Sequence, residues 1–357
     1  MQRHRMGRIA AVAASLTATI GISAGGAAAA TVSHQTDLQK GLAFYKGKTL
    51  TIIEPGATGA IFDLIARTEA TYLGQYLHAT VNVEDVTTGN TISGQDDTAG
   101  ANPDGLTLGL LNLGNDASLA LTHTPGLNFN PSRLAFIAAS APSTSLMIAS
   151  KSSPYTDFKS LVKASSPTVL MENTGTVDVL TSSLLGILGS SPHYVTGYTS
   201  IGSYVQGFVR GDGPVMMTNL ASTGPLVAGG TARALAVTSV PPVGTLYRQY
   251  VSSVPTFAQL EKQFPPKTTK QQKEWAALNA FFGATSTPLV TQTAVPGYKV
   301  DALRAAAVWM FKQSSFQSKM LGNGQNPKYV DPVTAKTDYS TVLAQGGILE
   351  PFFSRFT

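Results

Sequence analysis

The chain contains no cysteine among its 357 residues. Disulfides, thiolate metal sites and a lipid-modified N-terminal cysteine are therefore excluded. Charged residues are also scarce, at 13% of the chain, whereas hydrophobic residues account for 43%. This composition excludes a disordered chain and supplies enough apolar surface for two domains rather than one.

A concentration of positive charge is missing as well. The formal net charge of +5 owes three units to Arg3, Arg5 and Arg8, and the rest of the chain has 22 of the 25 basic residues against 20 acidic ones. The basic residues are spread along the sequence, without the stripe that binding to a phosphate backbone requires. We therefore predict no nucleic-acid partner.

Long apolar stretches are absent beyond residue 30. Residues 1–30 combine the basic start MQRHRMGR, an apolar segment and AAAA before Thr31, which offers an Ala-x-Ala cleavage site. These features predict a signal peptide over residues 1–30 and an exported protein, periplasmic or extracytoplasmic, that is soluble after cleavage. A single-pass anchor is the alternative, but Ser15, Thr17 and Gly25 interrupt the segment, and no later stretch approaches the ~20 apolar residues of a span.

No catalytic motif is recognisable. The chain lacks a Gly-x-Ser-x-Gly elbow, a Gly-x-x-x-x-Gly-Lys phosphate loop, a Gly-x-Gly-x-x-Gly fingerprint and a His-Glu-x-x-His helix. The histidines share no metal-ligand spacing, and Asp96, Asp97 and Asp104 lack the closing glutamate of a calcium loop. We therefore expect no enzyme activity, no metal site and no cofactor.

Strand-like and helical segments alternate along the chain. Thr49–Ile53 is β-branched and stops before Pro55, a helical pattern begins at Phe62, and a second one covers Val177–Leu188. The alternation predicts an α/β fold with mostly parallel sheets. The other strand-like segments are Ala79–Glu84, Leu106–Leu111, Leu134–Ala138, Ser145–Ala149, Val169–Met171, Pro214–Met217 and Ala232–Thr238.

Three of the strand-like segments end in a loop rich in glycine, threonine or asparagine that leads toward a helix. The loops are EPGATGAIFD at 54–63, DVTTGNTISG at 85–94 and ENTGT at 172–176. A helix N-terminus presents unpaired backbone N–H groups and a partial positive charge, and a preceding glycine lets a ligand approach the backbone. Such loops suit small anions, carboxylates in particular; alternatively, Gly56 and Gly59 serve only a tight turn.

Lysine and arginine are absent from residues 49–66, 84–132 and 172–209, which hold these loops. A carboxylate bound there relies on backbone N–H groups, hydroxyls and water rather than on an arginine. Glu54 and Asp63 leave open a ligand with a cationic or neutral polar part. Asp63 alternatively caps its own helix.

Five motifs occur in a recognisable order: FYKGKTLTII from residue 44, the loop that ends in Asp63 with Ala66 and Arg67, NPDGLTL from residue 102, ARALAVTS from residue 232 and SVPTFAQL from residue 253. In this order and spacing, the sequence resembles the extracytoplasmic solute-binding receptors of the tripartite tricarboxylate transporters, the Bug family. The resemblance covers about residues 44–352.

The resemblance implies a two-lobed periplasmic-binding-protein fold of type II, a Venus flytrap whose interlobe cleft closes on a small carboxylate. The implied lobes comprise residues 31–139 with 245–357, and residues 140–244. Val300–Leu321 is expected to form one long helix that returns to the first lobe. The implied partners are a small carboxylate ligand and the permease subunits of a membrane transporter, and the receptor itself is expected to be a monomer.

The family's first ligand loop aligns here without a gap, with Ala60 in place of a second glycine and Phe62 as its aromatic variant. The second loop departs from the family's Asn-x-Pro-Gly-Ala-Gly, because hydroxyl and amide residues replace proline and glycine. The resemblance implies a small mono-, di- or tricarboxylate, or an aromatic acid, as the ligand. Phe62 and this second loop suggest that the ligand has apolar bulk beside its carboxylate. The expected ligand-binding residues are Gly59, Ala60, Ile61, Phe62, Asp63, Thr88, Gly89, Asn90, Thr91, Asn112, Asn115, Asn173, Thr174, Gly175, Thr176, Tyr198 and Asn219.

Two other functions remain as alternatives. The first is a secreted hydrolase or lyase that uses Asp63 or Glu54 together with His123 or His193. The second is a ligand-sensing receptor that serves a signalling partner instead of a permease. Turnover of a small carboxylate distinguishes the first alternative from a binding protein, and the neighbouring genes distinguish the second.

Overall fold

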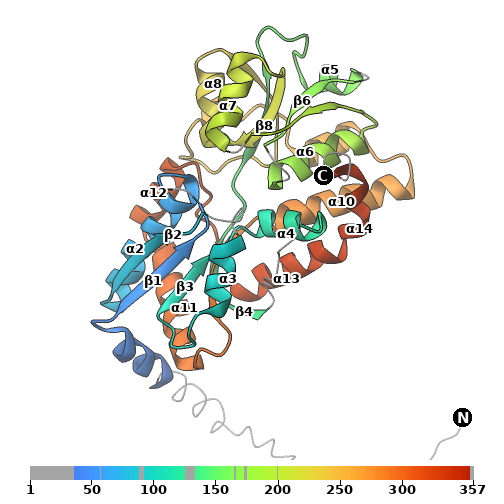
Figure 1. Cartoon of the computed structure of the whole chain (residues 1–357). Coiled ribbons are helices and arrows are strands. Elements are labelled where there is room, and N and C mark those ends of the chain that lie inside the picture. Colours follow the sequence, from blue (N-terminus) through green and yellow to red (C-terminus); the bar gives the residue numbers. More distant parts are fainter. Residues whose placement is uncertain are drawn as a thin grey trace, which may run out of the picture.

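A computed structural model describes residues 36–56, 58–87, 92–124, 133–164, 166–172, 175–198 and 200–353. The predicted signal peptide lies outside these residues. They form two β-sheets, each covered by helices, and Figure 1 shows the two sheets at opposite ends of the molecule. Within the described residues, no helix combines the length and the apolar character needed to cross a membrane.

The first sheet has six strands in the order β11-β4-β10-β3-β1-β2. We call this sheet and the helices on it the first lobe. Strands β1, β2, β3 and β4 were predicted from their local sequence, whereas β10 and β11 were not. The strands are β1 (Thr49–Glu54), β2 (Thr80–Asp85), β3 (Thr107–Leu110), β4 (Leu134–Ser140), β10 (Thr287–Gln292) and β11 (Tyr329–Val330).

The second sheet has five strands in the order β7-β6-β8-β5-β9. We call this sheet and its helices the second lobe. The chain passes between the sheets through residues 141–144, which connect β4 directly to β5. The strands are β5 (Ser145–Ser150), β6 (Thr168–Leu170), β7 (His193–Val195), β8 (Val215–Asn219) and β9 (Ala232–Val237).

The prediction of mostly parallel sheets is wrong, because both sheets are mixed. Strand β1 runs parallel to β2 and β3, and β6 runs parallel to β7 and β8. Strand β10 is antiparallel to β3 and β4, and β5 is antiparallel to β8 and β9. The antiparallel pairs involve strands that enter a sheet from the other lobe or from the C-terminal part of the chain, so no local βαβ unit sets their direction.

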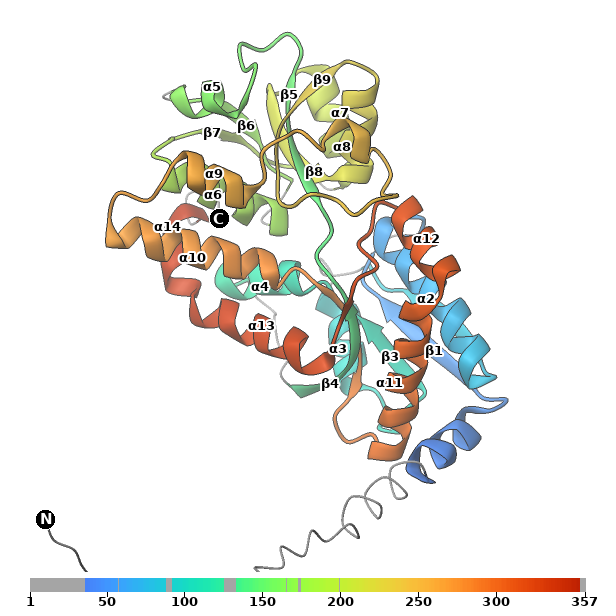
Figure 2. The ribbon, with the colours of Figure 1, turned by 180° about the vertical axis from the view of Figure 1, so that it is seen from behind.

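Helices cover both faces of the sheets. Helices α2, α11 and α12 pack together on one side of the first lobe, as Figure 2 shows from behind. The helices of the first half are α2 (Ile61–Leu77), α3 (Ile92–Gly100), α4 (Leu113–Leu121), α5 (Phe158–Lys163), α6 (Thr176–Ile187), α7 (Ile201–Arg210) and α8 (Leu220–Ala228). Those of the second half are α9 (Phe257–Gln263), α10 (Thr269–Gly283), α11 (Gly297–Lys312), α12 (Ser314–Gly322), α13 (Pro332–Ala344) and α14 (Gly346–Phe353).

The predicted single helix over Val300–Leu321 is wrong in one respect. The segment does return to the first lobe, where α11 packs on α2 and β4. It is divided into α11 and α12, because Gln313 adopts an extended conformation with ψ 122°. The side chain of Gln313 donates to the carbonyl of Trp309, and that of Gln317 donates to the carbonyl of Phe311. These side chains thus supply hydrogen bonds to carbonyl groups at the end of α11.

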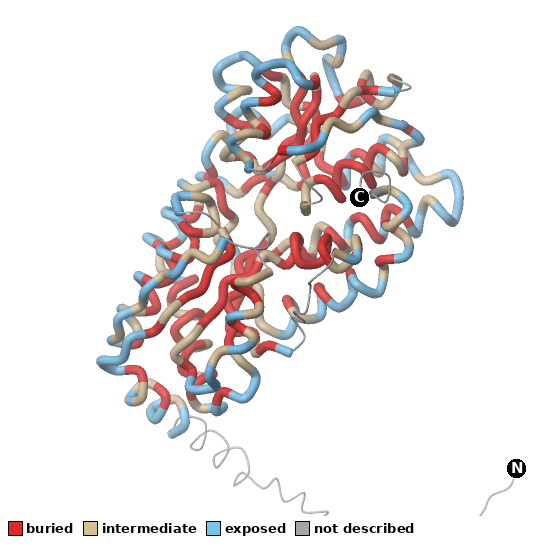
Figure 3. The backbone as a smooth tube through the Cα atoms, in the orientation of Figure 1, coloured by how far each residue is buried: buried red, intermediate tan, exposed pale blue. Residues whose placement is uncertain are grey.

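Buried apolar side chains form a core under each sheet and a third cluster between the lobes. Figure 3 shows that buried residues follow the strands of both sheets. The third cluster joins Phe136 of β4 to Met147 of β5 and includes Trp275 of α10. Helix α6 of the second lobe packs on α10 and α14 there. The C-terminal helices therefore hold the two lobes together along one side.

The limits of the lobes stay a prediction. The strands of the second sheet all lie between residues 145 and 237. The chain after residue 244 nevertheless touches this sheet, since Val237 forms a bridge with Thr256, and Phe264 packs on Phe158 at 6.1 Å between ring centroids. The residues that follow β9 therefore contribute to the second lobe before the chain returns to the first.

Candidate ligand cleft

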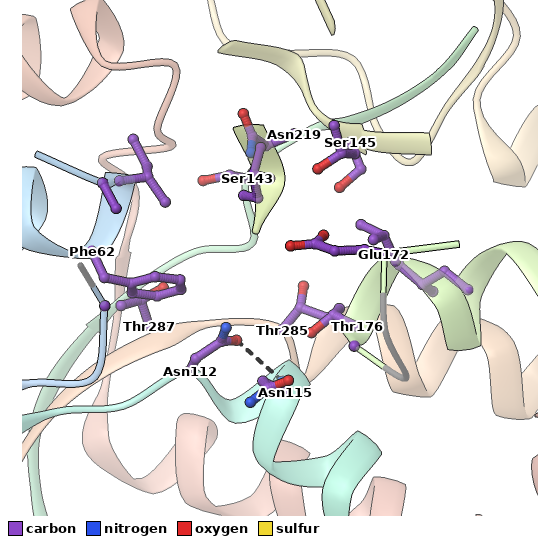
Figure 4. A pocket seen from close by; sticks show the side chains of 18 of the residues that line it. Phe62, Asn112, Asn115, Ser143, Ser145, Glu172, Thr176, Asn219, Thr285 and Thr287 are labelled. Carbon is purple, nitrogen blue, oxygen red and sulfur yellow. Dashed lines mark hydrogen bonds between the residues drawn. The ribbon is translucent and has the colours of Figure 1, made fainter. Parts of the chain in front are cut away.

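A cavity of about 330 Å³ lies between the two lobes. Its wall is formed by both sheets and by the segments that connect them (Figure 4). The lining residues are Gly56, Ala60, Ile61, Phe62, Asn112, Asn115, Ser143, Ser145, Glu172, Gly175, Thr176, Val177, Leu180, Tyr198, Ser200, Ile201, Thr218, Asn219, Phe282, Thr285, Thr287 and Gln325.

The first predicted loop contributes Gly56, Ala60, Ile61 and Phe62 to this wall. Gly59 and Asp63 are not among the lining residues. Gly59 has a φ of +78°, which an L-residue rarely adopts, and its N–H donates to Asp63 Oδ2 at 2.7 Å. Asp63 is buried and its Oδ1 lies 2.5 Å from Arg67 Nε. The glycine and the aspartate thus shape the loop and the start of α2. Asp63 is not the N-cap of this helix, because the N-cap is Ala60 and Asp63 is the third helical residue.

Behind the same loop, Glu54, Asp63 and Asp85 bring carboxylate oxygens within 4.8 Å of one another. Burial raises the pKa of Glu54 to about 7, and the neighbouring Asp85 adds to this effect. Burial also opposes ionisation of Asp85, but hydrogen bonds from Thr58 and Glu54 and the charge of Arg67 lower its pKa overall. A proton on Glu54 and the guanidinium of Arg67 therefore compensate the negative charge of this cluster.

Two predicted asparagines act as helix caps at the cavity. The side-chain oxygen of Asn112 accepts from the N–H of Asn115 at 3.1 Å at the start of α4. The side-chain oxygen of Asn219 accepts from the N–H of Ser222 at 2.9 Å at the start of α8. Because each cap uses the amide oxygen, the NH₂ group of the same side chain is the part that can donate to a ligand.

The third predicted loop leads into α6 from the second lobe. Asp178 fixes this loop by accepting from the N–H groups of Glu172 and Gly175, at 2.9 and 3.0 Å. Thr176, the first residue of α6, has a buried hydroxyl without a hydrogen-bond partner among the described residues. The predicted residues Asn173 and Thr174, like Thr88, Gly89, Asn90 and Thr91, lie outside the described residues.

Tyr198 lines the cavity as expected for a site residue, but its hydroxyl is already engaged. It donates to Asp212 Oδ2 at 2.9 Å, and burial together with this carboxylate raises the pKa of Tyr198 to about 12. Its ring packs against that of Tyr204, tilted by 54°, with 5.5 Å between the ring centroids. Tyr198 therefore offers an apolar ring face rather than a free donor.

Several lining residues escaped the sequence analysis because short hydroxyl residues carry no distinctive pattern. Ser143 lies in the segment that connects the sheets and donates to Gln325 Oε1 at 2.7 Å. Thr285 and Thr287 lie where α10 leads into β10. Since these segments are distant in sequence, only the fold brings them together.

Glu172 was visible as the first residue of the ENTGT loop, yet it was not among the predicted contacts. Burial raises its pKa to about 7, and the nearby Asp178 raises it further. No lysine, arginine or histidine occurs among the described residues that line the cavity.

No family model and no curated protein matches the chain. Solved structures do match it. Rpa4515 from Rhodopseudomonas palustris with adipate has a TM-score of 0.67 at 18% identity over 85% of this chain and 97% of that one. MatC from the same organism with bound malate has a TM-score of 0.64 at 18% identity over 85% and 99%.

A TctC solute-binding protein from Polaromonas, without ligand, has a TM-score of 0.63 at 14% identity over 87% of this chain and all of that one. At such identities the likeness concerns the fold alone. The predicted α/β fold is confirmed: the chain has the two-lobed fold of periplasmic binding proteins, and the cavity described above lies between the lobes.

Proposed function

We propose that this protein is an extracytoplasmic solute receptor of the tripartite tricarboxylate transporter type, which captures a small organic acid and delivers it to a membrane permease. The proposal includes export through the N-terminal signal, action as a monomer and no catalysis. Structures of the same fold that hold adipate and malate support it. So does the motif order of the sequence.

One observation carries the proposal: the N-caps of five helices line a single cavity. They are Ala60 of α2, Asn112 of α4, Gly175 of α6, Ser200 of α7 and Asn219 of α8. Each helix directs the positive end of its dipole and its unpaired N–H groups toward the cavity. The site therefore attracts an anion without a lysine or arginine, and the two lobes each supply part of it.

The hydrolase alternative receives no comparable support. Neither His123 nor His193 lines the cavity, and neither Glu54 nor Asp63 does. The imidazole of His123 is instead largely exposed and lies 3.6 Å from Glu350. An assay for turnover of any acid that binds tests this alternative directly.

The proposed function is tested by a thermal-shift screen of organic acids, amino acids and sugars on the chain from Thr31 onward, with mass spectrometry of co-purifying solutes. A ligand at about 100 times its Kd stabilises the folded state by about 2.7 kcal/mol. An organic acid is expected to give this shift. A response to sugars alone, with none to any acid, contradicts the proposal.

Thr176→Val offers a matched test of the site, because valine keeps the shape of threonine and removes the unpartnered hydroxyl. We expect weaker binding of the acid that emerges from the screen. Thr181→Val is the control, since Thr181 lies on the same helix, does not line the cavity, and donates to Val177 O at 2.6 Å. If both variants bind the acid as tightly as the unaltered protein does, the ligand does not bind at Thr176.

A further inference from the structure

The described residues that line the cavity include one carboxylate and no basic side chain. Figure 4 shows the side chain of Glu172 reaching from the second lobe into the space that Ser143, Asn219, Thr285 and Asn112 surround. It is the only acidic side chain among the described lining residues, and no basic side chain accompanies it. Among the described residues, the hydrogen bond from its N–H to Asp178 fixes its backbone.

The groups around Glu172 add negative rather than positive charge. Asp178 of α6 is 1% exposed, and its two oxygens accept from loop N–H groups. Tyr204 of α7 is buried and donates to Leu170 O, and Tyr198 donates to Asp212. The segments that face Glu172 from the other sides contribute only neutral residues to the lining: Phe62, Ser143, Ser145, Thr218, Phe282, Thr285 and Thr287.

Burial and, after it, the charge of Asp178 raise the pKa of Glu172 to about 7, and no cationic side chain among the described lining residues offsets them. A ligand that is negative throughout adds a like charge and keeps Glu172 protonated. A ligand with an ammonium group supplies the missing partner, while its carboxylate lies at the helix N-termini. A ligand with both groups therefore pairs its carboxylate with the helix N-termini and its ammonium group with Glu172.

Resting on the proposed function, we propose that Glu172 binds the cationic group of the solute, and that the preferred ligand is a small zwitterion with a carboxylate and an ammonium group. Glu172 is then the residue that separates such solutes from di- and tricarboxylates of the same size. Phe62 and Leu180 supply the apolar wall for the carbon chain between the two charged groups.

Pairs of acids that differ by one ammonium group test this inference: alanine and propionate, γ-aminobutyrate and butyrate, aspartate and succinate, glutamate and glutarate. Titration calorimetry at pH 7 measures the affinity of each for the chain from Thr31 onward. In the pairs that bind, we expect the ammonium-bearing acid to bind at least about tenfold more tightly. The inference is overturned if succinate binds more tightly than aspartate, or glutarate more tightly than glutamate.

Proton linkage gives a second, independent readout. Because the ammonium group requires ionised Glu172, its binding releases a proton, and the Kd falls by about tenfold from pH 6 to pH 8 for a group that titrates near 7. A dicarboxylate that binds beside protonated Glu172 takes up a proton instead, and its Kd rises over the same range. Calorimetry in two buffers of different ionisation enthalpy distinguishes release from uptake.

Glu172→Gln is expected to weaken zwitterion binding by at least about tenfold and to abolish its dependence on pH. Glu84→Gln, an exposed residue of β2, is the matched control and leaves both unchanged. A Glu172→Gln variant that binds the zwitterion as well as before overturns the inference, provided that its melting temperature without ligand shows a folded protein. If no acid of any class binds the unaltered protein, the proposed function itself fails.

Discussion

Gly114 of α4 and Thr176 of α6 meet across the two lobes, so closely that a Cβ atom on Gly114 would lie 2.6 Å from Thr176 Oγ1 and 2.8 Å from its Cγ2. Helix α4 follows a strand of the first sheet, and α6 follows a strand of the second. Thr176 also lines the cavity. The absence of a side chain at Gly114 therefore permits the approach of the lobes at the ligand.

We predict that Gly114→Ala opens the cleft. Overpacking at a close contact costs about 1–3 kcal/mol, and β-branched Thr176 cannot swing its side chain away freely. Ligand affinity should therefore fall by about tenfold or more, and small-angle scattering should show a larger radius of gyration. Gly283→Ala is the control, because no described atom beyond its own helix backbone and chain neighbours lies within 4 Å of the added methyl group. An unchanged affinity of Gly114→Ala contradicts the prediction.

Gly59 yields a second prediction, which concerns stability as well as binding. Its φ of +78° costs a β-branched residue about 1–2 kcal/mol, whereas asparagine tolerates this conformation better. Gly59→Val should therefore lower the free energy of unfolding more than Gly59→Asn, as measured by urea denaturation. Since Ala60, Ile61 and Phe62 line the cavity, Gly59→Val should also weaken ligand binding. Equal stability of the two variants would show that the loop relaxes.

The local part of the fold was predictable because it depends on local sequence. The strands around Ile52 and Val83, and the helix that starts near Phe62, follow from β-branched runs and from the change to a helical period. The direction of β5 and β10 was not predictable, since it depends on pairing between segments far apart in the chain. The prediction made from the local alternation of strands and helices therefore contained too many parallel strand pairs.

The site divides in the same way. Asn112 was predicted from its place just after a strand, whereas Asn219 was expected from the resemblance; both are helix N-caps in the structure. Ser143 and Thr285 could not be predicted as lining residues, because nothing in the local sequence distinguishes them from other hydroxyl residues. Only the fold brings them to the cavity. Asp63 stays a prediction: it belongs to the ligand loop in sequence, and in the structure its partners are Gly59 and Arg67.

Glu69 provides a prediction about pH. It is buried in α2, and burial raises its pKa from 4.5 to about 8. The folded state therefore binds more protons than the unfolded state between these values, so the stability that the neutral acid permits below pH 4.5 is lost as the pH rises toward 8. The slope is at most about 1.4 kcal/mol per pH unit for this one group.

Glu69→Gln should remove that loss, so the variant should be more stable than the unaltered protein at pH 8 and similar to it at pH 5. Chemical denaturation at both pH values measures the difference. Glu84→Gln, at an exposed position, should shift stability little at either pH. A Glu69→Gln variant with the same pH dependence as the unaltered protein shows that other groups cause it, among them Asp116, whose pKa burial raises to about 8.

The last prediction concerns Tyr204, whose hydroxyl joins two strands of the second sheet. It donates to Leu170 O of β6 at 2.9 Å and accepts from the N–H of Met217 of β8 at 3.3 Å. The two strands pair directly only at Val169 and Val215. Tyr204→Phe leaves two buried backbone groups unpaired, so we expect a loss of about 1–3 kcal/mol in urea denaturation.

Tyr204→Phe should also loosen the ligand site, because Leu170 lies two residues before Glu172 in the chain. Affinity for the ligand should therefore fall together with stability, even though Tyr204 does not line the cavity. Tyr250→Phe is the control: this tyrosine is 42% exposed, and its hydroxyl joins no strands. If Tyr204→Phe loses no more stability than Tyr250→Phe, then water or a strand shift satisfies the two backbone groups, and the hydroxyl is not what holds β6 to β8.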